Sequence, residues 1–126
     1  MSECIIIMTE EILYLEDDKQ LRELGRTFLE RQGYDYVHTH DSLEEGIDCY
    51  EGESVVVTDY AFEGEITGMD VAEALNGEAE VIIYTGYNQE FVERDAGTEL
   101  PEGIQFLTRG GEFNELIKEV EQAIED

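Results

Sequence analysis

Carboxylates follow two short apolar stretches of the sequence. Glu16, Asp17 and Asp18 come directly after residues 12–15, and Asp59 comes directly after residues 54–58. Carboxylates that lie side by side repel one another, and burial increases the cost. Hard oxygen ligands select hard cations, and a shallow site with few protein ligands suits Mg²⁺, which keeps part of its water shell. The acids therefore predict a magnesium site, provided that the fold brings them together.

Two other apolar stretches end in groups that suit an anion. Thr85 closes residues 81–85 with a hydroxyl, and Arg109 follows residues 104–108 with a positive charge. Each feature also has an ordinary explanation. Acids before a helix stabilise its N-terminus, an aspartate after a strand is often a turn residue, and a threonine or arginine there can be a turn hydroxyl or a surface charge. The combination of all of them favours a site.

The segments that carry these residues alternate between strand and helix patterns. Apolar, mostly β-branched runs predict strands at 12–15, 36–39, 54–58, 81–85 and 104–108. Apolar residues at helical spacing, with caps at Asp41 or Ser42 and at Asn88, predict helices at 19–32, 41–50, 68–76, 88–96 and 112–125. Strands that alternate with helices predict an α/β fold, a (βα)₅ doubly wound parallel sheet with both faces covered.

A sheet of this kind places ligands beyond the carboxyl ends of its strands, where the strand order reverses. For the flavodoxin-like order 2-1-3-4-5, that point lies between the first and third strands. The acids would stand there, and Thr85 and Arg109 would stand further along the same edge. The topology therefore predicts that all these groups share one rim.

The charge of the chain restricts its partners and its surroundings. It has 33 acidic and 7 basic residues, a net charge of −26. Nucleic acids and anionic membranes need Lys and Arg to neutralise phosphate, so we expect the chain to bind neither. The acids are spread along the whole chain, which favours a halophilic, salt-adapted surface over the alternative of one acidic binding face.

Length and cysteine content predict a single domain in a reducing compartment. We expect the domain at residues 11–126, with 1–10 as an extension and the start at Met1 or Met8. Cys4 and Cys49 have no metal-ligand spacing, and the beginning of the chain resembles neither a signal peptide nor a membrane segment. These features predict the cytoplasm.

The motifs together resemble the receiver domain of two-component response regulators, over about residues 11–126. The resemblance is carried by ILYLEDD at 12–18, VVVTDY at 55–60, VIIYTG at 81–86 and IQFLTRGGEFNELI at 104–117. It implies that Asp59 is the phosphoacceptor, assisted by Thr85 and Arg109. It also implies that Mg²⁺ is held by the side chains of Glu16, Asp17 and Asp59 and by the backbone carbonyl of Ala61.

The resemblance also implies partners and a switch. A sensor histidine kinase would donate the phosphoryl group, and Thr85 would then move and let the ring of Phe106 change place. The face formed by roughly residues 87–124 would meet an effector protein or output domain, or a second copy in a homodimer. Such a domain is a signalling switch rather than a turnover enzyme, and it catalyses at most its own phosphorylation and dephosphorylation.

Departures from the family pattern leave a second interpretation open. Arg109 stands where the family has a lysine, Gly110 stands where it has a proline, and the segment after Asp59 lacks the family's Met-Pro and is one residue longer before Gly68. These differences suit a pseudo-receiver, an interaction module that takes no phosphate.

Enzyme classes on similar sheets fit the sequence less well. A haloacid-dehalogenase phosphatase needs Asp-x-Asp after its strand, and a P-loop enzyme needs G-x-x-x-x-G-K-[ST]; neither motif is present. Carboxylates after the first strand would repel the phosphate of a flavodoxin's FMN. His38 and His40 alternate along one predicted strand, and a zinc site would need at least one further ligand.

Overall fold

Strands and helices alternate along the chain. The computed structural model describes residues 11–34, 36–48, 50, 52–61, 66–109 and 114–125. The strands are β1 (Glu11–Leu15), β2 (Tyr36–His40), β3 (Val55–Thr58), β4 (Glu80–Thr85) and β5 (Gln105–Thr108). The helices are α1 (Lys19–Arg31), α2 (Leu43–Asp48), α3 (Gly68–Leu75), α4 (Gln89–Ala96) and α5 (Asn114–Glu125). All predicted elements are present, and their bounds differ from prediction by no more than two residues.

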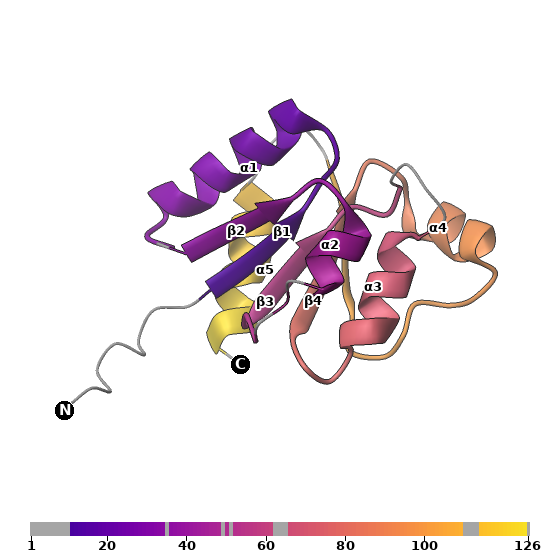
Figure 1. Ribbon diagram of the computed structural model, residues 1–126. Coiled ribbons are helices and arrows are strands. Elements are labelled where there is room, and N and C mark those ends of the chain that lie inside the picture. The colour runs from indigo at the N-terminus through magenta and orange to yellow at the C-terminus, as the bar shows by residue number, and fades with distance from the viewer. Residues whose placement is uncertain are drawn as a thin grey trace.

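The strands form one parallel sheet in the order β2-β1-β3-β4-β5. The helices α1 and α5 cover one face of the sheet, and α2, α3 and α4 cover the other (Figure 1). This arrangement confirms the predicted doubly wound fold and its strand order. In the described part of the chain, no helix combines the length and apolar character that crossing a membrane would require.

Alternate residues of each strand point to opposite faces, so the core has two halves. Leu13 and Leu15 belong to the cluster beneath α2, α3 and α4, which we call the first cluster. Ile12 and Tyr14 belong to the second cluster, beneath α1 and α5. Because both faces are covered, β1 is apolar at successive positions, and the same holds for β3.

Polar side chains cap two helices as predicted, and a glycine follows the end of a third. The Asn88 side chain accepts a hydrogen bond from the Phe91 N–H at 2.8 Å, which caps α4. The Ser42 hydroxyl, rather than Asp41, accepts from the Glu45 N–H at 3.3 Å at the start of α2. Gly33 follows α1 with a φ of 100°, a left-handed conformation that glycine adopts without strain.

One apolar residue of α1 does not reach the core. Leu24 is 48% exposed, whereas Leu29 is buried. The reason is Gly25, since a Cβ atom there would lie 2.5 Å from the Tyr14 hydroxyl. The helix therefore approaches β1 closest at this glycine, and Leu24 is turned to the flank. Residues 1–10, Cys49 and Phe113 lie outside the described residues.

Candidate functional site

The site is built on backbone that neighbouring strands hold in place. Three hydrogen bonds continue the sheet one residue beyond its strands: the Glu16 N–H donates to the His40 carbonyl at 3.2 Å, the Asp59 N–H to the Leu15 carbonyl at 3.1 Å, and the Arg109 N–H to the Thr85 carbonyl at 2.6 Å. The residues that follow β1, β3 and β5 are therefore fixed relative to one another along one edge of the sheet.

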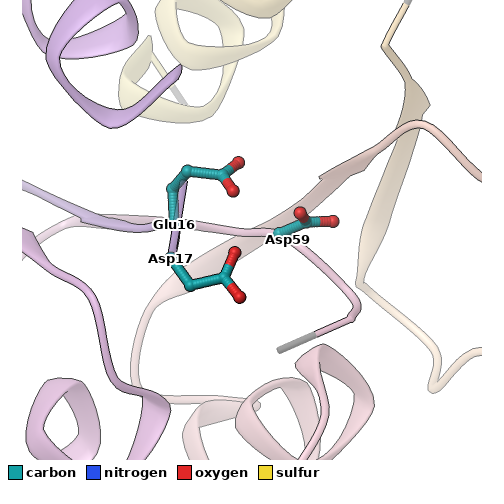
Figure 2. Close-up of side chains that lie close together, drawn as sticks. All are labelled: Glu16, Asp17 and Asp59. Atoms are coloured by element: carbon teal, nitrogen blue, oxygen red, sulfur yellow. The ribbon is translucent and has the colours of Figure 1, made fainter. Parts of the chain in front are cut away.

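The structure brings together the three predicted carboxylate ligands. One oxygen from each of Glu16, Asp17 and Asp59 lies within 4.8 Å of the others. Figure 2 shows Glu16 and Asp17 extending from the end of β1 beside Asp59 at the end of β3. Glu16 is 2% exposed and Asp59 8%, whereas Asp17 is exposed. This edge of the sheet is therefore a small acidic site that is open on one side.

The third acid of the EDD stretch does not join this group. The Asp18 side chain accepts a hydrogen bond from the Leu21 N–H at 3.1 Å and caps α1. Its own N–H donates to Glu16 Oε2 at 3.2 Å. Helix capping and site formation, which the sequence left as alternatives, are therefore divided between neighbouring residues.

Gly68 allows α3 to begin directly against the phosphoacceptor candidate. A Cβ atom at Gly68 would lie 2.3 Å from the Asp59 carbonyl oxygen and 2.9 Å from the Tyr60 Cα. The Gly68 N–H donates to the Tyr60 carbonyl at 2.8 Å. Only glycine fits this approach, which fixes the backbone on either side of the intervening loop. Residues 62–65 of that loop lie outside the described residues.

Arg109 provides the positive charge of the site. Its Nη1 donates to Glu16 Oε1 at 3.2 Å and lies 3.9 Å from Asp59 Oδ2. The guanidinium carbon lies 5.9 Å from the centroid of the Tyr84 ring, in cation–π range. The side chain is 21% exposed, so the ion pair is largely shielded from solvent. Gly110, the next departure from the family pattern, lies outside the described residues.

The acids are too many for their counter-charge. Burial and the neighbouring Asp59 charge raise the pKa of Glu16 to about 7, although the Asp18 N–H and Arg109 act in the opposite direction. Among the described residues, Arg109 is the guanidinium that pairs with side chains of this group of three carboxylates, which leaves two negative charges when all are ionised. A divalent cation would balance them, whereas without a cation the site favours a proton on Glu16.

The remaining predicted site residues surround the acids. Thr85 is fully buried, and its hydroxyl oxygen has no hydrogen-bond partner within the described ranges. Phe106 and Ala61 are partly buried and pack against the first cluster. The catalytic role of Thr85, the switch role of Phe106 and the carbonyl ligand at Ala61 stay predictions.

Arg22 supports the acidic turn and was missed by sequence reasoning. Its Nη1 donates to the Glu16 carbonyl oxygen at 2.8 Å and lies 3.4 Å from that of Asp17. It therefore braces the backbone of two acids without neutralising their carboxylates directly. The sequence did offer a signal for this role, because Arg22 is a basic residue one turn into the helix that follows the acidic residues.

Tyr60 was also missed, although it is adjacent to Asp59. It is 3% exposed, and its hydroxyl donates to Asp95 of α4 at 2.5 Å. Burial and this hydrogen bond raise the pKa of Tyr60 to about 12. The only sequence signal was a large aromatic residue directly after the phosphoacceptor candidate.

Comparisons with known proteins identify the family. The family model described as the response regulator receiver domain matches residues 12–121. The chain therefore belongs to the response regulator receiver domain family, and this places it in two-component signalling. A comparison with curated proteins found no match.

Solved receiver structures share the fold. The response regulator protein TrrA from Thermotoga maritima, in complex with Mg(2+)-BeF, has a TM-score of 0.77 at 22% identity, with 91% of this chain and 99% of that chain covered. A response regulator receiver domain protein from Clostridium thermocellum has a TM-score of 0.75 at 25% identity, with 92% and 94% covered. The BeF3-activated DrrB receiver domain has a TM-score of 0.73 at 20% identity, with 94% and 100% covered.

Proposed function

We propose that this domain accepts a phosphoryl group on Asp59 from a sensor histidine kinase, in a reaction that requires Mg²⁺. The observation that carries the proposal is the convergence of Glu16, Asp17 and Asp59, whose ligand oxygens lie within 4.8 Å of one another. A guanidinium and a buried, unpartnered hydroxyl in the described part of the chain accompany them. This combination supports a site for a cation together with an anion.

The donor set fits Mg²⁺. Carboxylate oxygens are hard ligands, and the exposed side of the site at Asp17 leaves access for the waters that Mg²⁺ retains. Glu16, Asp17 and Asp59 would hold the ion, with the carbonyl of Ala61 as a further ligand. When bound, Mg²⁺ supplies neutralisation of the phosphoryl oxygens.

The proposed reaction is a displacement at phosphorus. Asp59 Oδ1 accepts the Tyr60 N–H at 2.7 Å, which leaves Oδ2 as the nucleophile. Oδ2 forms the new bond to phosphorus as the bond from phosphorus to the kinase histidine breaks, and the imidazole leaves with its electron pair. Arg109 and Thr85 donate to phosphoryl oxygens, so catalysis consists mainly of positioning and charge stabilisation.

The proposed output is a change at the surface formed by α4, β5 and α5. The phosphoryl group adds charge and strong acceptors, and it shifts the equilibrium only by its differential affinity for the two states. Thr85 would move toward it, and the Phe106 ring would fill the vacated space. An effector protein, an output domain or a second copy would then bind this surface. We place this switch in the cytoplasm, with no direct nucleic-acid contact.

A pseudo-receiver is the second candidate function, and one observation favours it. Arg109 Nη1 donates to Glu16 Oε1 at 3.2 Å, and the same nitrogen lies 3.9 Å from Asp59 Oδ2. An arginine that stays in this position would hold the acids without a metal ion, and the domain would act as an interaction module.

Acetyl phosphate with Mg²⁺, applied in molar KCl, separates the two functions. We expect the wild type to gain the mass of one phosphoryl group, and we expect Asp59→Asn to gain none. Asp17→Ala should weaken Mg²⁺ binding at least about tenfold, since it removes a ligand. The matched control is Asp41→Ala, at an exposed acid that directly follows β2. A wild type without mass gain, and without an amide shift on adding beryllofluoride and Mg²⁺, would establish the pseudo-receiver.

A further inference from the structure

Tyr60 contacts both the phosphoacceptor candidate and a helix that is distant in sequence. Its backbone N–H donates to Asp59 Oδ1 at 2.7 Å. Its phenol O–H donates to Asp95 Oδ2 at 2.5 Å, across 35 residues of the chain. One residue therefore holds the carboxylate with its backbone and the last turn of α4 with its side chain.

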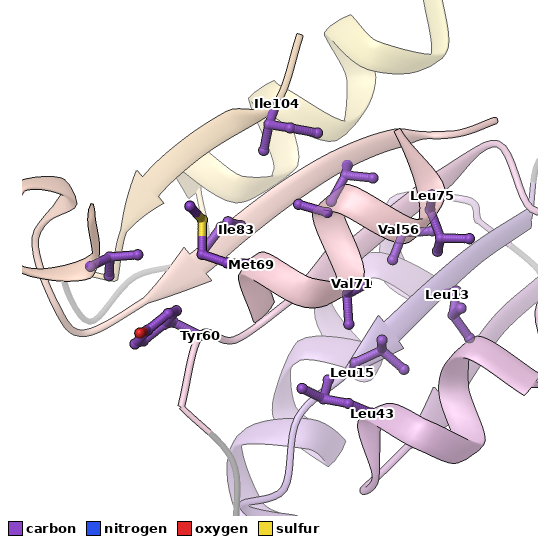
Figure 3. Close-up of a cluster of buried hydrophobic side chains, with 13 residues drawn as sticks. Leu13, Leu15, Leu43, Val56, Tyr60, Met69, Val71, Leu75, Ile83 and Ile104 are labelled. Atoms are coloured by element: carbon purple, nitrogen blue, oxygen red, sulfur yellow. The ribbon is translucent and has the colours of Figure 1, made fainter. Parts of the chain in front are cut away.

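The ring of Tyr60 is fixed between these two bonds. It belongs to the first cluster, and Figure 3 shows it near Met69 at the end of the cluster, with its hydroxyl directed away from the other labelled residues. Its ring meets that of Tyr87 edge-on, at a centroid distance of 6.5 Å. Tyr87 in turn stacks on Phe91 of α4 at 4.9 Å. A buried ring with contacts on two sides has little freedom to absorb a displacement of its backbone.

The position of Asp95 indicates that this hydrogen bond is specific. Asp95 lies in the last turn of α4, where the helix dipole disfavours a negative charge. A hydrogen bond from the Tyr60 phenol offsets part of that cost, because bonds to a charged acceptor are the stronger ones. The Asp95 carboxylate is thus stabilised by the Tyr60 phenol at a position where its charge is otherwise unfavourable.

We propose that Tyr60 is a positioning residue that orients the Asp59 carboxylate and couples its state to α4 through Asp95. The inference rests on the proposed function, since it concerns the same carboxylate. By occupying Oδ1, the Tyr60 N–H leaves Oδ2 available, 3.9 Å from Arg109 Nη1. A group added at Oδ2 changes the charge on the carboxylate whose Oδ1 accepts the Tyr60 N–H, and in this proposal the fixed side chain transmits the change to α4. This route is separate from the one through Thr85 and Phe106.

The test compares Tyr60→Phe, Asp95→Ala and the double variant in molar KCl. The probe is beryllofluoride with Mg²⁺, followed by the backbone amide chemical shifts of α4 and by the apparent affinity of the probe. We expect each single variant to lose most of the α4 shift and to bind the probe about fivefold more weakly, while the shift at Phe106 persists. The double variant should match the single ones, since all three remove one bond.

Two matched controls separate coupling from stability. Tyr50→Phe also deletes a phenol, one that bonds to backbone carbonyls of Glu53 and Glu78. Glu90→Ala deletes an exposed acid of α4 that pairs with Arg94 at 2.8 Å. Both controls should respond to the probe as the wild type does, even where the melting temperature falls.

The outcomes distinguish this inference from the proposed function. If the wild type responds to the probe and Tyr60→Phe and Asp95→Ala show the same α4 shift, the coupling through Tyr60 is wrong and the proposed function stands. If the effects of the two variants add, they act separately and the inference is again wrong. A wild type without any response overturns both. Should Tyr60→Phe fail to fold, the exposed Asp95→Ala decides alone.

Discussion

Replacing Glu16 with glutamine should stabilise the metal-free protein at high pH. The folded protein raises the pKa of Glu16 from its ordinary 4.5 to about 7. A raised pKa means that the folded state binds the proton more tightly than the unfolded state, so the stability is present below about pH 4.5 and is lost as the pH rises through 7. A glutamine side chain carries no charge at any pH, so the Glu16→Gln variant would avoid this loss.

The size of the effect follows from the pKa shift. Each pKa unit corresponds to about 1.4 kcal/mol, so ionising Glu16 costs the folded state about 3 kcal/mol, to order of magnitude. The amide has one acceptor oxygen, whereas Glu16 accepts from both the Asp18 N–H and Arg109. Losing one of these bonds costs about 1 kcal/mol. We expect a net gain in the free energy of unfolding of about 2 kcal/mol at pH 8.

Urea unfolding in molar KCl with a chelator measures this gain. Glu16→Gln should exceed the wild type at pH 8 and approach it near pH 5. Asp17→Asn, at an exposed acid of the same site, reports what removing one negative charge does by itself. Our account of the site is refuted if Glu16→Gln is no more stable than the wild type at pH 8, or if its advantage is the same at both pH values. Added Mg²⁺ should stabilise the wild type and leave Glu16→Gln unchanged.

Three further predictions concern the site and the surface. Thr85→Val removes a buried hydroxyl without a described partner, so the free energy of unfolding should rise by about 1 kcal/mol while the response to beryllofluoride is lost. Thr108→Val, at an exposed residue, should change neither the free energy of unfolding nor that response. Gly68→Ala places a methyl group 2.3 Å from the Asp59 carbonyl and should cost about 2 kcal/mol by urea unfolding, unlike Glu73→Ala on the same helix. The net charge of −26 predicts a melting temperature that rises from low to molar KCl, and a constant value would contradict a salt-adapted surface.

The sequence was sufficient for the sheet because its strands are buried on both faces. Runs such as Val55–Thr58 are apolar at nearly every position, and only a doubly covered parallel sheet needs that. The acidic site followed from topology, since the carboxyl ends of β1 and β3 are neighbours. The sequence did not show that Asp17 joins the acidic site while Asp18 caps α1, because an acid before a helix suits both roles.

Contacts between side chains distant in sequence were beyond prediction. No local pattern links Tyr60 to Asp95, because their contact depends on how α4 is placed against the sheet. The exposure of Leu24 has the same origin, since it is set by the close approach of Gly25 to Tyr14. Periodicity identifies the side of a helix that is apolar, whereas the packing partner determines which residues of that side reach the core.

The sheet hydrogen bonds that hold Glu16, Asp59 and Arg109 also determine how the site can open. Their amide hydrogens are bonded to neighbouring strands, so they should exchange with deuterium only in the rare openings that also expose the central strands. The edge of the sheet that carries the candidate site and the core would then form one cooperative unit that opens as a whole. A destabilising core substitution anywhere in β1 or β3 would accordingly also speed amide exchange at the site.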